Sequence, residues 1–279
     1  MSTTTTVPAA PVRAERPAYK VTTARVVRAE WAKFWSLRSS WITLGVALVF
    51  VLAFGLIRDW RYTVMMNAGH VHDPEVLDAN AVGLSLFGLN FGQLAVGVLG
   101  VLVTAGEYST GMIRSTLAAV PRRLPVLWSK ALIFGAVAFL LGLVAAVTAF
   151  GIGIGILSGT KAALGFGDAG VLRALVMAGA YLALIGICGV ALGSLLRSVA
   201  GGIAVLLGTL LLVPGLMELF PTSWQNNVSQ FLPDHAGDSM YALHQDVHTL
   251  SATAGLLVLA GWTALALAGA AYRLKRSDA

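Results

Sequence analysis

Six long apolar stretches without a single charged residue dominate the pattern of hydrophobic and polar positions along the chain. The 19 Lys and Arg and the 13 Asp and Glu all lie outside these stretches. Each stretch has about the 17–25 residues that an α-helix needs to cross a hydrocarbon core of about 30 Å. The pattern therefore predicts an all-α polytopic membrane protein whose residues 21–279 form one six-helix transmembrane domain. The expected spans are residues 41–57, 81–105, 131–157, 174–196, 199–217 and 250–272.

Composition supports lipid as the solvent, because 57% of the residues are hydrophobic and only 11% are charged, against about 25% charged in soluble domains. Residues 1–20 differ from the rest. They are rich in Ser, Thr, Ala and Pro and contain no apolar run, which predicts a disordered tail and no secretory signal. The only cysteine, Cys188, lies in the fourth span, so an intrachain disulfide is excluded.

The basic residues are distributed unevenly between the two sides of the membrane. If the N-terminus is cytoplasmic, 15 Lys and Arg lie inside and 4 outside, whereas 4 acidic residues lie inside and 9 outside. This bias follows the positive-inside rule and predicts that both termini are cytoplasmic. It also accounts for the net charge of +6 without a nucleic-acid partner. Arg exceeds Lys by 14 to 5, which together with abundant Ala, Val, Leu and Gly favours a bacterial plasma-membrane protein.

An amphipathic helix is expected just before the first span, over residues 25–38. Val27 and three aromatic residues share one face of this helix, while the basic residues lie away from that face. Such a helix lies in the membrane interface, with its tryptophans at headgroup depth and its cations facing anionic lipid. The residues assigned to this interfacial helix are Arg28, Glu30, Trp31, Lys33, Phe34, Trp35 and Arg38.

The chain lacks the usual signs of an enzyme. No glycine-rich loop precedes a Lys-Ser or Lys-Thr pair, so a nucleotide site of its own is not expected. No His, Asp or Glu falls inside a span, which disfavours intramembrane hydrolysis and proton-coupled transport. The histidines all fall in external segments, where imidazoles are usually solvated, and no metal site is predicted. They are His70, His72, His235, His244 and His248.

Some polar and small residues inside the spans carry expectations about packing. Asn90 and Gln93 are three apart on one helix, where they line a cavity or hydrogen-bond a neighbouring helix. Glycines four residues apart in three spans predict close approach of helix backbones. These pairs are Gly88 and Gly92, Gly151 and Gly155, and Gly189 and Gly193.

Two connections between spans are longer than a simple turn. The external segment 218–249 has aromatic residues and no Lys or Arg, which predicts short helices that dip towards the membrane. In the cytoplasmic segment 106–130, Thr110 is expected to cap a short helix that Pro121 ends. Its apolar face comprises Met112, Ile113, Thr116, Leu117 and Val120. A helix of this kind lies on the membrane or binds a cytoplasmic protein.

The same cytoplasmic segment resembles a known motif. The order Glu107, Gly111, Arg114, Leu117, Pro121, Arg122 is similar to the cytoplasmic motif of type-2 permeases of ATP-binding-cassette transporters. Residues 30–33 (Glu-Trp-Ala-Lys) and 37–41 (Leu-Arg-Ser-Ser-Trp) resemble the opening helix of that family. The six spans, the tight turn between the fourth and fifth, and the external segment before the sixth extend the resemblance over most of the chain after residue 20.

The resemblance implies a division of labour between chains. Two permeases pair as a homodimer or heterodimer, and each docks a separate ATPase subunit that binds ATP and Mg, with no cofactor in this chain. The docking segment then acts as a coupling helix between spans two and three. It comprises Glu107, Tyr108, Thr110, Gly111, Met112, Ile113, Arg114, Leu117, Pro121 and Arg122. In this picture Glu107 and Arg114 tie the segment to the interfacial helix or to the ATPase.

The expected function is thus the permease subunit of an exporter for a hydrophobic or amphipathic substrate, without enzymatic activity of its own. The alternative from another class is a membrane scaffold or sensor subunit that holds a cytoplasmic partner without transporting anything. A secondary transporter is a third reading, which the uncharged spans disfavour.

Overall fold

The computed structural model describes residues 22–69, 78–120, 123–245 and 247–276. Within these ranges the chain is helical and has no strand. Six helical segments are long and apolar enough to cross a membrane, which confirms the predicted all-α polytopic fold. They are α2 (Arg38–Asn67), α4–η1–α5 (Ala81–Ser85, Leu86–Gly88, Leu89–Ser109), α7 (Leu124–Leu157), α8 (Val171–Leu196), α9–η2–α10 (Val199–Leu207, Gly208–Leu212, Val213–Met217) and α13 (Ala252–Arg276).

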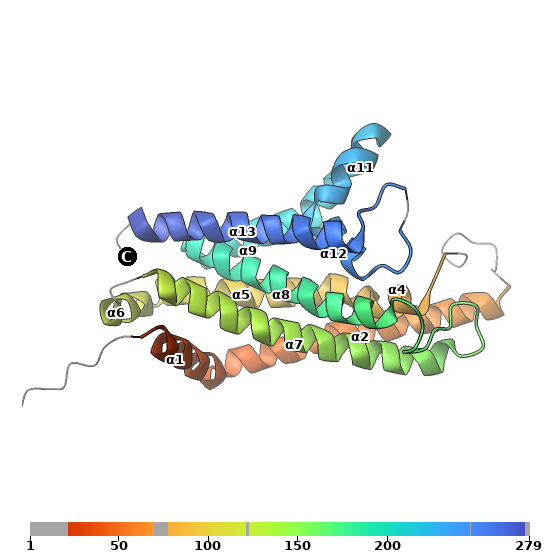
Figure 1. Ribbon diagram of the computed structural model, residues 1–279, viewed down its shortest axis with the longest axis horizontal. Coiled ribbons are helices and arrows are strands. Elements are labelled where there is room, and N and C mark those ends of the chain that lie inside the picture. The colour runs from red at the N-terminus through yellow and green to blue at the C-terminus, as the bar shows by residue number, and fades with distance from the viewer. Residues whose placement is uncertain (1–21, 70–77, 121–122, 246, 277–279) are drawn as a thin grey trace, which may run out of the picture.

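Shorter helices lie at the two ends of this bundle. Helices α1 (Thr23–Ser36) and α6 (Met112–Ala119) lie at one end, and α12 (Pro233–Tyr241) lies towards the other (Figure 1). Helix α11 (Thr222–Val228) projects away from the crossing helices and buries none of its residues (Figure 1). A short turn of 3-10 helix, η3 (Ser229–Phe231), joins α11 to α12. The expected disordered tail lies outside the described residues.

Helix α8 is the centre of the bundle, since α5, α7 and α13 all pack directly against it. The apolar windows of α5, α7 and α8 are 50–56% buried, whereas that of the fifth crossing, α9–α10, is only 17% buried and that of α13 22%. Arg197 and Ser198 alone separate α8 from α9, as predicted. Arg197 has a φ of +55°, and Ser198 accepts a hydrogen bond from the Gly201 amide at 3.2 Å. The fifth and sixth crossings therefore form the exposed side of the chain.

Backbone contacts hold α5 against α8. A Cβ on Gly189 would lie 2.3 Å from the Gly97 carbonyl oxygen, and one on Gly193 would lie 2.7 Å from the Val101 carbonyl oxygen. Gly88 and Gly92 make equally close contacts with Val51 of α2. Two of the three predicted glycine pairs therefore mark close helix contacts. The third prediction is wrong, because Gly151 and Gly155 have no atom within 3.4 Å of an added Cβ.

Several helices extend beyond the apolar windows that predicted them. Helix α2 continues to Asn67, so the expected external loop from residue 58 begins only after a further ten residues of helix. As a result Asp59 lies inside a crossing helix and is fully buried, with the Ser85 hydroxyl donating to its carboxylate at 3.0 Å. Glu107 and Lys130 likewise lie inside α5 and α7. The crossing helices therefore contain charged residues, although the apolar windows alone suggested that they would not.

We predict that Gly189→Ala destabilises the protein by about 1–3 kcal/mol, because its methyl group has no room between α5 and α8. The matched control is Gly155→Ala in α7, which gains the same helix propensity and meets no atom within 4 Å. Thermal unfolding of the purified protein in detergent should show a lower midpoint for the first variant only. Equal midpoints for both variants would contradict the α5–α8 contact.

Candidate functional site

Helix α1 lies along α7 and presents a narrow stripe to it. Val26, Glu30 and Phe34 are buried at this contact, one helical turn apart. Trp31 lies outside this stripe, is 45% exposed and packs edge to face on Trp35, with ring centroids 5.1 Å apart. The predicted helix is therefore present. Its expected orientation is wrong for Lys33, which turns towards the bundle and pairs with Glu107.

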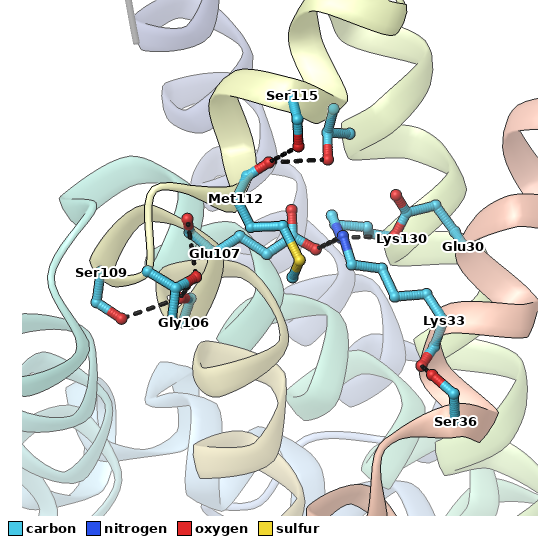
Figure 2. Close-up of polar contacts among 11 residues, drawn as sticks. Glu30, Lys33, Ser36, Gly106, Glu107, Ser109, Met112, Ser115 and Lys130 are labelled. Atoms are coloured by element: carbon cyan, nitrogen blue, oxygen red, sulfur yellow. Dashed lines mark hydrogen bonds and ion pairs between the residues drawn. The ribbon is translucent and has the colours of Figure 1, made fainter.

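Four charged side chains from three helices meet at this end of the bundle, and we call them the charge cluster: Glu30, Lys33, Glu107 and Lys130. Lys130 on α7 donates to Glu30 on α1 at 2.5 Å and to Glu107 Oε1 on α5 (Figure 2). The Lys33 ammonium also pairs with Glu107 Oε1 (Figure 2). The Lys130 side chain is only 3% exposed, and both carboxylates are nearly as buried. The cluster thus joins α1, α5 and α7 through one ammonium group.

The charge cluster is neutral, with two ammonium groups and two carboxylates. Removing a charged group from water costs several kcal/mol, and close opposite charges return that cost only when every charge has a partner. Because the partners come from α1, α5 and α7, the three helices must keep their relative positions for the cluster to remain paired. The arrangement is a rigid connection between elements that are otherwise held by apolar packing.

Helix α6 follows α5 after one sharp joint. Gly111 has a φ of +73°, in the left-handed region that favours glycine, and α6 begins at the next residue. Thr110 is not the expected cap, because its hydroxyl donates back to the Gly106 carbonyl at 2.9 Å. Thr116 donates in the same way to the Met112 carbonyl of α6 itself, at 3.2 Å.

The two faces of α6 differ from the predicted ones. Ile113 and Leu117 are buried against the bundle, but Met112 is 42% exposed and does not belong to the buried face. The outward face combines one cation with small side chains and comprises Met112, Arg114, Ser115, Ala118 and Ala119. Pro121 and Arg122 lie outside the described residues, so their expected roles stay predictions.

Tyr108 connects the end of α5 to the turn between α8 and α9. The Arg197 guanidinium lies 5.2 Å from the centre of the Tyr108 ring, within cation–π range. Of the remaining residues assigned to the interfacial helix, Arg28 and Arg38 are exposed. The structure therefore brings Glu30, Lys33, Glu107 and Tyr108 into one connected end of the bundle.

Sequence reasoning missed Lys130, the residue at the centre of the charge cluster. It was grouped with the basic residues that set topology, although it is the last charged residue before the third apolar window. The available signal was the helix register, since α7 begins at Leu124 and continues through Lys130 without a break. A lysine two turns inside a crossing helix needs a buried partner.

A second polar group lies deeper in the bundle. Gln93 is 1% exposed, and its amide donates to Asp234 of α12 at 2.9 Å and accepts from the Tyr181 hydroxyl of α8. Gln93 therefore contacts neighbouring helices, the second of its two expected roles. Asn90 donates to the Phe87 carbonyl of its own segment at 3.2 Å.

Segment 218–249 packs against the crossing helices. Trp262, ten residues into α13, donates to the Phe231 carbonyl just before α12 at 2.9 Å. At 1.5 Å per residue, that contact lies about 15 Å along α13. The end of the segment therefore lies within the helix bundle, with α12 packed between α8 and α13.

Polar side chains on the outer part of this segment line two neighbouring pockets. His235 and His248 contribute to both, and His244 to one. Burial raises the pKa of Asp238 to about 7, and the neighbouring Asp234 carboxylate raises it as well. In the part of the chain that the structure describes, no three His, Cys, Asp or Glu side chains are grouped closely enough to hold a metal ion. His70 and His72 lie outside that part.

No protein-family model matches the chain, and no curated protein matches it either. Arguments about function therefore start from the sequence pattern and from the geometry of the charge cluster and α6.

We predict that Lys130→Met destabilises the protein by about 3–5 kcal/mol, because it leaves Glu30 buried without a cation. Adding Glu30→Gln to this variant restores neutrality and should recover part of the loss. The control is Lys161→Met, which removes an exposed lysine and should change little. Unfolding midpoints in detergent measure all three effects. An unimpaired Lys130→Met protein would argue against the cluster.

Proposed function

We propose that the chain is the membrane-spanning permease subunit of an ATP-binding-cassette exporter. It couples ATP hydrolysis by a separate ATPase subunit to outward transport of a hydrophobic or amphipathic substrate. The proposal is supported above all by one observation: a short helix with an exposed outward face, α6, is fixed to the crossing helices by a buried charge cluster.

The connection from α6 into the bundle is short. Glu107 lies four residues before the Gly111 joint, and Lys130 and Lys33 hold its carboxylate against α7 and α1. A push on α6 therefore reaches three helices at once, with no flexible segment between α6 and the cluster except the joint itself. ATP binding to the ATPase subunit can shift this chain between two conformations only if the ATP-bound and ATP-free forms of that subunit hold α6 differently.

The proposed function also implies which membrane the chain spans, which partners it has and how it is oriented. Two permease chains pair in a bacterial plasma membrane, and ATP and Mg bind in the ATPase subunits. The weakly buried fifth and sixth crossings leave apolar faces available to a second permease or to lipid. The excess of basic residues on the side of α1, α6 and the C-terminus supports a cytoplasmic position for both termini.

Arg114 is the residue that tests this proposal, because it is exposed on α6 whereas Glu107 is buried and its loss would disturb folding. We predict that Arg114→Glu abolishes co-purification of the ATPase, or lowers substrate-stimulated ATP hydrolysis at least tenfold, as loss of a charged interface contact does. The control is Lys275→Glu, the same charge reversal at an exposed position near the C-terminus. A complex that forms and turns over ATP normally with Arg114→Glu would contradict the proposed docking face. A partner that binds without hydrolysing ATP would favour a scaffold.

The proposed orientation has its own test. A reporter active only in the cytoplasm should give a signal when fused after Arg123 or at the C-terminus, and none after Ala68 or Gln225. The positive-inside rule predicts this pattern, because the basic residues gather on the side of Arg123 and the C-terminus. The inverse pattern would place α6 outside the cell and overturn the proposal.

A further inference from the structure

A pocket opens beside the charge cluster, between α1, α5 and the start of α6. It has a volume of about 200 Å³, several times the roughly 30 Å³ occupied by one liquid water molecule. Its walls are mostly apolar and include Phe34, Leu37, Leu102 and Val103. All four members of the charge cluster line it as well.

One oxygen atom of the charge cluster has no hydrogen-bond partner. Both Lys33 and Lys130 pair with Glu107 Oε1, and Glu107 Oε2 is buried without a partner. An ionised oxygen in that position is costly unless it accepts a hydrogen bond from a donor. The neighbouring Lys33 ammonium is the least buried of the cluster, with 23% of its side chain exposed. Glu107 and Lys33 both line the pocket, which therefore brings together a carboxylate with one unpartnered oxygen and a partly exposed cation.

The pocket changes from apolar to polar along α5. Leu102, Val103, Gly106, Glu107 and Thr110 follow one face of the helix and its end, and they span about 12 Å at 1.5 Å per residue. Leu102 at the apolar end is 37% exposed, and Leu37 across the pocket is 42% exposed. This order matches a membrane lipid, whose chains lie at the depth of Leu102 and whose headgroup lies at the depth of Glu107.

Three tryptophans near the pocket indicate that it lies at the depth of a membrane interface. Trp41 donates to the Trp35 carbonyl at 3.2 Å, and the two rings lie 4.3 Å apart. Trp31 and Trp41 are 45% and 52% exposed, next to Leu37 at the bend between α1 and α2. Exposed tryptophans of this kind are typical of the boundary between headgroups and acyl chains. The occupant suggested by these neighbours is a lipid of that leaflet and not a protein.

We propose that this pocket binds the headgroup of phosphatidylethanolamine. Its ammonium donates to Glu107 Oε2, its phosphate lies beside Lys33, and its chains leave along Leu37 and Leu102. The inference does not depend on the proposed function, since it concerns this chain alone. The lipid completes the hydrogen bonding of the same carboxylate that links α1, α5 and α7.

Phosphatidylcholine provides the sharpest comparison, because it has the same charges and chains but no N–H donor. Native mass spectrometry of the purified full-length chain, titrated with lipids of matched chains, should show about tenfold tighter binding of phosphatidylethanolamine. The N,N-dimethyl derivative keeps one N–H and should retain most of the preference. Equal binding of phosphatidylcholine, or tighter binding of anionic phosphatidylglycerol, would overturn the proposal.

A protein variant tests the location of the site. Leu102→Trp fills the pocket from its apolar wall without touching a charged group. This variant should bind phosphatidylethanolamine and phosphatidylcholine about equally tightly. The control is Leu132→Trp on α7, at a position that is 64% exposed and does not line the pocket. Unfolding midpoints identify a misfolded variant, and the lipid series on the unaltered chain still decides the proposal in that case. A preference that survives in folded Leu102→Trp protein would place the lipid elsewhere and overturn this assignment.

Discussion

Electrical neutrality among largely buried charges governs the α1 end of this bundle. Lys130 has almost no contact with solvent, and its charge is compatible with burial only because Glu30 and Glu107 reach it from two other helices. The position of α1, which packs against α7 through a narrow stripe, is fixed by that requirement. The position of α6 is fixed in turn, because it follows the helix that supplies Glu107.

The sequence predicted the crossings well because their cause is local. A run of uncharged residues long enough to span the bilayer is visible without knowing any contact, and all six runs became crossing helices. Helix ends were less predictable. Asp59, Glu107 and Lys130 lie just outside an apolar window but inside a helix. Each of these charged groups has a buried partner on another helix.

The charge cluster itself could be predicted only in part. Glu107 and Glu30 stood out through the family resemblance, but nothing in the sequence states that α1 turns Lys33 inwards. That orientation depends on Glu107, more than seventy positions away, and helical periodicity alone favoured the aromatic face. Glycine spacing had the same limitation, since two pairs lie at helix contacts and the third, with identical spacing, does not.

The contact between α5 and α8 restricts how the bundle can change shape. With carbonyl groups of one helix seated on glycines of the other, neither helix can rotate or slide without a backbone collision. The pair therefore behaves as a single beam, with the charge cluster near one end and the Gln93 contacts about 21 Å along it, at 1.5 Å per residue. A rearrangement that keeps this contact must therefore involve the less buried crossings, such as α9–α10 and α13.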